Sequence, residues 1–256
     1  GPLRGRYIWS LEEACDGSVW GTYAADGLVR IDPATGKTTH FAPGKLGLAE
    51  SGFGLQLVVG EDCRMWLLRA DGVWRVKTDA PFGFRRVIAS EGSQSPVFLS
   101  LLLTEDGGGF VTGSRGLMRV DLGSASEREA RVVEAWALGG SVNVSHPADS
   151  NRLWLGMRRG LALFDPATGR SESITFGSER ESLDSVQVSG IMSGAEGEVW
   201  LSTAGRGVAR LPPGWRGFSP YRPVFGETEL QRITSIARDP EGDVWLGSAN
   251  YGVFEF

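Results

Sequence analysis

Cysteine and histidine are scarce in this 256-residue chain, which limits the kinds of site it can build. Two cysteines are too few for a disulfide scaffold or a zinc site. Cys15 and Cys63 each precede a tryptophan in neighbouring sequence units. We expect both to be unpaired thiols, because such turns should lie farther apart than the ~7 Å between Cα atoms that a disulfide spans. His40 and His146 fall at different positions of their units, which argues against a His-based metal site or acid–base pair.

The chain also lacks a basic surplus and a long hydrophobic run. Its net charge of −5 argues against a general binder of nucleic acid or anionic membranes. The longest apolar stretch, residues 97–103, suits a buried strand and is well short of the roughly 18–20 residues that span a bilayer. No direct membrane insertion is therefore expected in this segment. No secretory signal is visible, although Gly1-Pro2 is typical of a protease-cleavage scar.

Catalytic and cofactor motifs are missing as well. There is no Walker-type loop and no Gly-x-Ser-x-Gly elbow, and the glycine-rich stretch at residues 105–109 fits a hairpin turn better than a phosphate cradle. Carboxylates are numerous, but most, including Glu12 and Glu13, are interpreted as solvated turn charges. We predict no catalytic residue, no metal and no cofactor.

What the chain does contain is six near-copies of one strand-turn-strand unit. Each unit has an aromatic residue near its middle and a glycine six or seven positions later. The aromatics are Trp20, Trp66, Phe110, Trp154, Trp200 and Trp245, and the glycines are Gly27, Gly72, Gly116, Gly160, Gly207 and Gly252. A fixed period near 45 residues indicates a repeat architecture, because one such unit cannot bury its own apolar face.

Four short strands can be placed in each unit, and they predict an all-β propeller of six blades occupying residues 1–256 as one domain. The aromatic belongs to the second strand, where its ring should pack between adjacent sheets. The repeated glycine should need an unusual backbone angle or close packing. The sixth unit ends at its third strand. That blade is either incomplete or closed by residues 3–6; otherwise the chain is an open arc, or a ring completed by a second copy in a homodimer.

The unit resembles the repeat of the two-component regulator propellers. That repeat reads Asp-x-x-Gly-x-aliphatic-Trp-aliphatic-Gly-Thr/Ser, then Gly-aliphatic-x-Arg-aliphatic-Asp. Residues 239–248, DPEGDVWLGS, match the first half, and residues 27–32 and 116–121 match the second. Phe110 departs from the pattern in the third unit, and the second and fourth units replace the Asp-x-x-Gly turn. All six units show part of the pattern.

The resemblance implies a periplasmic or extracellular sensor region of a bacterial signalling protein. In that family the propeller precedes a membrane segment and an output domain such as a histidine kinase or diguanylate cyclase, and some members sense oligosaccharides. The implied partners are a small-molecule or carbohydrate ligand and signalling domains of the same protein. A protein-interaction scaffold is the first alternative, and a propeller enzyme resembling the streptogramin lyases is the second.

The loops between second and third strands should share one face of the propeller and predict a ligand site there. The residues before the repeated glycines are Asp26, Asp71, Arg115, Arg159, Arg206 and Tyr251, and Arg158 adds to the arginines. Near this face the first strands begin with Tyr7, Phe53, Gln187 and Arg232, and Trp9 is close by.

Arginines in such a ring could hold a carboxylate or phosphate through paired donors, and aromatics beside them would suit a sugar-like ligand. The predicted ligand-binding residues are Arg115, Arg159, Arg206, Arg232, Tyr251 and Tyr7. The plainer interpretation is that exposed loops need polar residues.

Overall fold

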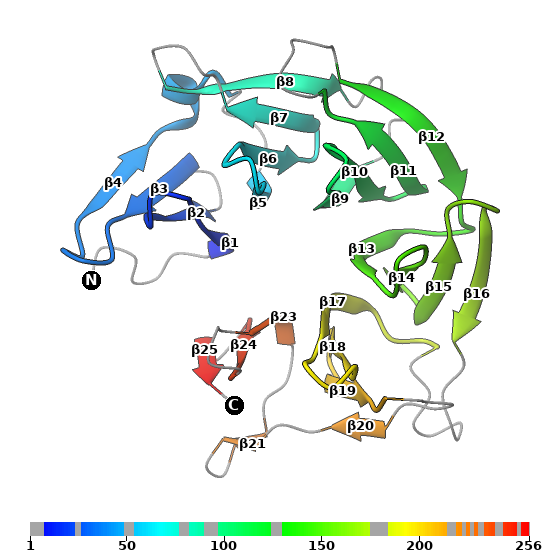
Figure 1. Cartoon of the computed structure of the whole chain (residues 1–256). Helices are drawn as coiled ribbons and strands as arrows, with labels where there is room; N and C mark the ends of the chain where they lie inside the picture. Colours follow the sequence, from blue (N-terminus) through cyan, green and yellow to red (C-terminus); the bar gives the residue numbers. More distant parts are fainter. Residues whose placement is uncertain are drawn as a thin grey trace. The chain divides into compact units, whose positions relative to one another are not determined.

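The computed structural model describes thirteen stretches of the chain (Figure 1). They are residues 8–23, 27–48, 54–76, 82–89, 97–123, 130–174, 184–213, 219–221, 224–225, 228–229, 233–238, 243–249 and 252–255. The chain forms two compact units, unit 1 at residues 1–137 and unit 2 at residues 138–256. That residues 1–256 form one domain stays a prediction.

Unit 1 contains three four-stranded antiparallel sheets, which we call blades 1 to 3. Blade 1 consists of β1 (Ile8–Glu13), β2 (Val19–Tyr23), β3 (Gly27–Ile31) and β4 (Thr38–Phe41). A short 3-10 helix, Pro43–Leu46, follows it. Blade 2 consists of β5 (Gly54–Val59), β6 (Met65–Arg69), β7 (Gly72–Val76) and β8 (Phe84–Ala89). Blade 3 consists of β9 (Phe98–Leu103), β10 (Gly108–Gly113), β11 (Gly116–Asp121) and β12 (Arg131–Ala137).

Unit 2 contains blades 4 to 6 and a small hairpin. Blade 4 consists of β13 (Val142–Pro147), β14 (Leu153–Met157), β15 (Leu161–Asp165) and β16 (Arg170–Ile174). Blade 5 consists of β17 (Val188–Ser193), β18 (Val199–Thr203), β19 (Gly207–Leu211) and β20 (Ser219–Tyr221). The hairpin pairs β21 (Val224–Phe225) with β22 (Thr228–Glu229). Blade 6 has three strands, β23 (Ile233–Arg238), β24 (Val244–Ser248) and β25 (Gly252–Glu255).

The predicted fold class, an all-β propeller of six blades, is confirmed. Each described blade is an antiparallel meander, and the last has three strands in place of four. The segment that could supply a closing strand, residues 3–6, lies outside the described residues.

Three of the blade aromatics pack between neighbouring sheets, as predicted. Trp20 joins a buried cluster with Leu57 and Leu67 of blade 2, and Trp154 joins one with Val188 and Leu201 of blade 5. Trp66 likewise packs with residues of blade 3. These three indoles are 4–6 % exposed and Phe110 is 8 % exposed, whereas Trp245 is 37 % exposed. A fully buried aromatic of this size contributes at most about 4–6 kcal/mol by area, which makes these rings main anchors between the blades.

The six repeated glycines all adopt positive φ, which confirms the predicted backbone requirement. Gly27 has a φ of 96°, and a Cβ there would collide with the carbonyl oxygen of Phe41. The glycine therefore lets the outer strand return close to the start of the third strand, where a side chain would not fit.

Each first strand carries a β-bulge near its start. The pairing with the second strand slips by one residue between Ile8 and Ser10, and blades 2, 4, 5 and 6 show the same slip at the equivalent place. In blade 3 Thr112 pairs with Ser100 and Gly113 pairs with Phe98, so the bulge residue is Leu99 of the first strand, β9. A bulge leaves one residue out of the ladder and re-aims its side chain.

The third-strand arginines of the repeat support the blades themselves. Arg30 lies with its guanidinium 5.9 Å from the centre of the Trp20 ring and forms an ion pair of 2.8 Å with Asp16. Arg210 similarly lies 5.4 Å from the ring of Trp200. These contacts tie the third strand to the aromatic, and in blade 1 also to the hairpin turn before it.

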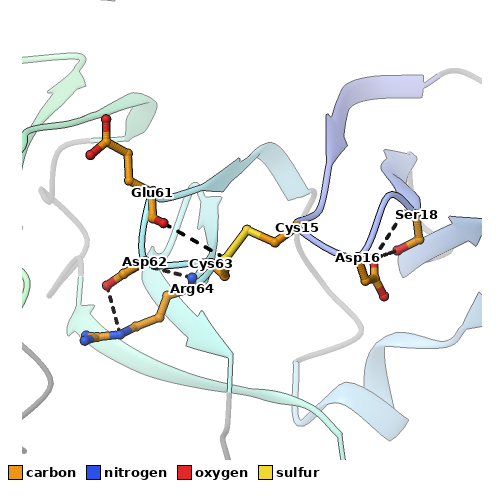
Figure 2. Close-up of a disulfide and its surroundings, with 7 residues drawn as sticks. All are labelled: Cys15, Asp16, Ser18, Glu61, Asp62, Cys63 and Arg64. Carbon is orange, nitrogen blue, oxygen red and sulfur yellow. Dashed lines mark hydrogen bonds and ion pairs between the residues drawn. A yellow bond between two sulfur atoms is a disulfide. The ribbon is translucent and has the colours of Figure 1, made fainter.

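The prediction of unpaired cysteines is wrong. Cys15 and Cys63 form a disulfide between the β1–β2 and β5–β6 turns, with their Cα atoms 5.6 Å apart (Figure 2). The first strands of blades 1 and 2 pack side by side, so their turns meet closely enough for a bridge. Cys63 takes the turn position that Gly17 has in blade 1, and it is the one described non-glycine residue with positive φ, at 62°.

Candidate functional site

A shallow depression of about 450 Å³ lies in unit 2, between loops of blades 4 and 5. Three segments line it: the β14–β15 loop, the segment before β17, and the β18–β19 loop. The lining residues are Arg158, Arg159, Ser185, Val186, Gln187, Ala204, Gly205 and Arg206. We call this feature the arginine depression.

Backbone hydrogen bonds hold the three segments together. The amide of Gly160 donates to the carbonyl oxygen of Val186 over 2.9 Å, which joins the β14–β15 loop of blade 4 to the segment entering blade 5. The amide of Ala204 donates to the carbonyl oxygen of Gln187 over 2.9 Å. Both loops are therefore fixed to the same short segment, and this limits how far their side chains can move apart.

Side-chain hydrogen bonds also link the inner strands of blades 4, 5 and 6. Val186 and Val188 are buried, and the side-chain amide of Asn143 on β13 donates to the carbonyl oxygen of Val188 on β17 over 3.0 Å. On the next strand, the Ser189 hydroxyl donates to the carbonyl oxygen of Ile233 over 3.1 Å. Asn143 and Ser189 are both bulge residues, so the bulge turns a polar side chain toward the neighbouring strand.

Positive charge dominates the lining. Three arginines line the depression together with a glutamine and a serine, and no aspartate or glutamate is among the lining residues. Arg158 and Arg159 are exposed, and no group among the described residues pairs with either guanidinium. Arg206 is also exposed but is already engaged by another group, as is Asp184 beside the depression. Such a lining can hold an anion, because arginine donors are fixed in a fork that matches oxyanions.

The structure brings together two of the predicted ligand-binding residues, Arg159 and Arg206, and it adds Arg158 and Gln187. Arg115 lies in unit 1, exposed in the turn between β10 and β11, and its role stays a prediction. The other three predicted ligand residues, Tyr7, Arg232 and Tyr251, lie outside the described residues, as do Asp26 and Phe53.

Two further residues named from the sequence can be placed. Asp71 is bound within blade 2, where it pairs with the buried Arg69 at 3.2 Å and accepts a hydrogen bond from the indole nitrogen of Trp74. Trp9 is 55 % exposed on β1. Sequence reasoning missed Ser185 and Val186, although the prediction of Gln187 at the start of β17 pointed to this segment.

Two titratable groups with displaced pKa values lie opposite blade tryptophans. Glu12 pairs with Trp20 across β1 and β2, and His146 pairs with Trp154 across β13 and β14. Burial raises the pKa of Glu12 to about 7 and lowers the pKa of His146. The interpretation of Glu12 as a solvated turn charge is wrong, because β1 continues to residue 13 and Glu12 is half-buried on it.

The imidazole of His146 also reaches the next blade. Its Nε2 lies 2.9 Å from the hydroxyl oxygen of Ser193 on β17. Burial favours the neutral imidazole, so Nε2 can accept a hydrogen bond from that hydroxyl. Neither residue lines the arginine depression. Across the described stretches, no cluster of three or more His, Cys, Asp or Glu is arranged to hold a metal ion, and no helix there is long and apolar enough to cross a membrane.

Solved structures with a similar fold include a lyase and the extracellular domain of a protein described as a two-component system. Virginiamycin B lyase from Staphylococcus aureus superposes with a TM-score of 0.68 at 15 % identity, over 97 % of this chain and 83 % of that chain. The catalytically inactive histidine-to-alanine variant of that lyase, solved with quinupristin, gives 0.68 at 14 % identity, over 98 % and 84 %. At these identities the likeness concerns the fold alone.

The extracellular domain of a protein described as a hybrid two-component system from Bacteroides thetaiotaomicron superposes with a TM-score of 0.58 at 12 % identity. The superposition covers 97 % of this chain and 38 % of that domain. No curated protein matches the sequence.

Residues 229–250 match the sequence profile described as the two component regulator propeller. They include β24 with Trp245 and the DPEGDVWLGS stretch on which the resemblance was based. The resemblance is therefore confirmed, and residues 229–250 carry a repeat of the two-component regulator propellers.

Proposed function

We propose that this chain is a non-catalytic sensor propeller that binds a small polar, anionic or sugar-like ligand in the arginine depression. The observation that carries the proposal is the convergence of Arg158, Arg159 and Arg206 on one depression without a lining carboxylate. Like charges close together raise the free energy of the empty site, and an anion that binds there lowers it.

The two-component regulator repeat and the likeness to an extracellular two-component domain support a role in signalling. The arginine loops belong to adjacent blades, so a ligand that contacts both would stabilise the packing of blade 4 against blade 5. A change of that kind is what an attached output domain could detect. We include the presence of such an output domain in the same protein in the proposal.

We also propose that the chain works on the periplasmic or extracellular side of the membrane. The Cys15–Cys63 disulfide supports this location, because structural disulfides form and persist mainly in oxidising compartments. The likeness to an extracellular domain points the same way.

A lyase activity is the main alternative, since the fold is shared with virginiamycin B lyase. A histidine-to-alanine substitution inactivates that enzyme. This chain has two histidines: His40 lies on the outer strand β4, and His146 hydrogen-bonds to Ser193 away from the arginine depression. The groups that line the depression are suited to holding an anion rather than to acid–base catalysis, which favours binding over turnover.

Thermal melting with a panel of neutral sugars, uronates, phosphorylated sugars and small carboxylates tests the proposed function. At least one ligand should raise the melting temperature of the wild-type chain, and the shift should be lost in the double variant R159A/R206A. Arg170→Ala is the matched control, because it removes an exposed arginine from β16 of the same unit, outside the depression. Equal shifts in wild type, double variant and control would refute the site.

A further inference from the structure

The arginine depression allows a narrower statement about ligand charge, which rests on the proposed function. We infer that it recognises a doubly charged oxyanion, of the phosphate-monoester class, carried on a small polar molecule. Neutral sugars and single carboxylates would bind there more weakly.

Three arginines from two different loops favour a phosphate monoester over a single carboxylate. Two of the lining arginines belong to the β14–β15 loop and the third belongs to the β18–β19 loop. One carboxylate presents two oxygens in a plane and is satisfied by a single guanidinium fork. A phosphate monoester presents three terminal oxygens arranged as a pyramid, so it can accept hydrogen bonds from donors on both sides of the depression.

The charges of Arg158 and Arg159 favour a ligand with two negative charges. Arg206 is left out of this balance, because another group already interacts with it. The two adjacent guanidinium groups of Arg158 and Arg159 remain, without a partner among the described residues. Their combined charge is matched by a dianion, whereas a monoanion would leave about one positive charge uncompensated.

The remaining lining sets the kind of molecule that carries the anion. Gln187 and Ser185 supply a neutral amide and a hydroxyl, which can bind hydroxyl groups of a polar body. The volume of about 450 Å³ is within the range of small-molecule sites. A phosphorylated monosaccharide has the required charge, polarity and size.

Three probes that share one sugar ring test the inference: glucose, glucuronate and glucose 6-phosphate. Isothermal titration at constant ionic strength and pH 7.5 should give the tightest binding for glucose 6-phosphate, by at least about tenfold over glucuronate. Because the second pKa of a phosphate monoester is about 6, this advantage should shrink at pH 5, where the monoanion prevails. The R159A/R206A variant should lose the preference, and Arg170→Ala should keep it.

Several results would overturn the inference. They are binding of glucuronate or glucose as tight as that of glucose 6-phosphate, no binding of glucose 6-phosphate, or a phosphate preference that survives in R159A/R206A. Glucuronate or glucose binding that is lost in R159A/R206A would remove the phosphate class but retain the proposed function. The thermal-melting experiment with the wider ligand panel tests the proposed binding function independently of the phosphate preference.

Discussion

The side-chain amide of Asn143 and the carbonyl oxygen of Val188 join blade 4 to blade 5 by a hydrogen bond of 3.0 Å. Asn143 is the residue that the β13 bulge leaves out of the strand ladder, and Val188 is fully buried at the start of β17. Because the arginine depression lies between loops of these same two blades, we expect the loss of this contact to change its width.

Replacing Asn143 by leucine should therefore affect both stability and binding. The change leaves the buried Val188 carbonyl without its donor, which costs about 1–3 kcal/mol of unfolding free energy. Urea denaturation measures this loss, and the affinity for anionic ligands should fall with it. Asn151→Ala is the control, because Asn151 is exposed in the turn before β14 and its change should cost less than about 0.5 kcal/mol. A loss no larger than that of the control would contradict this role of Asn143.

Reduction of the Cys15–Cys63 disulfide should destabilise the chain. The bridge closes a loop with a sequence separation of 48 residues, so its removal should cost about 2–4 kcal/mol. Thermal melting with and without a reductant measures the difference. Unit 1 should retain its strands, because Trp20 still packs into the core between blades 1 and 2.

Two variants separate the effect of the bridge from that of the backbone at Cys63. Both C15S/C63S and C15S/C63G lack the disulfide, but glycine adopts the left-handed conformation at residue 63 without the roughly 1–2 kcal/mol that a Cβ costs there. C15S/C63G should therefore be the more stable of the two. Equal stability of the two variants would mean that the backbone at residue 63 adds no strain.

The carboxyl of Glu12 should make stability depend on pH. Its folded pKa of about 7 is raised by burial above the ordinary value of 4.5. The folded state therefore binds the proton more tightly than the unfolded state, so the contribution of Glu12 is full below about pH 4.5 and is lost as pH rises through about 7.

The variant Glu12→Gln should remove this part of the pH dependence, and its stability relative to wild type should improve between pH 5 and 8. Glu13→Gln is the control, since Glu13 is the exposed neighbour on the same strand. Denaturant midpoints of wild type and both variants, measured between pH 5 and 8, test this difference. The same pH profile in wild type and Glu12→Gln would show that Glu12 stays ionised in the folded chain.

Much of the fold could be predicted from the sequence. The aromatic and the glycine recur at a fixed spacing, and the strands around them can be recognised from the residues of each unit. Strand β17 was predicted with its observed ends, and β4 was predicted at residues 38–41. The requirement for positive φ at Gly27 also follows from residue type. These features depend on neighbours in the chain.

The errors concern contacts between blades. The distance between Cys15 and Cys63 depends on how two blades pack, which the spacing within one blade does not give. The burial of Glu12 depends on the same packing. It also depends on where β1 ends, because Glu12 was assigned to the turn and lies within the strand. In the candidate site, Arg159 and Arg206 could be paired from their equivalent repeat positions, whereas Ser185 lies in a connection that has no repeat pattern.

A crystal structure of the chain grown with glucose 6-phosphate tests the account most directly. We expect the phosphate between the β14–β15 and β18–β19 loops, with its oxygens within hydrogen-bonding distance of the guanidinium groups of Arg159 and Arg206. A ligand bound on the turns that carry Cys15 and Cys63, with the arginine depression left empty, would contradict it.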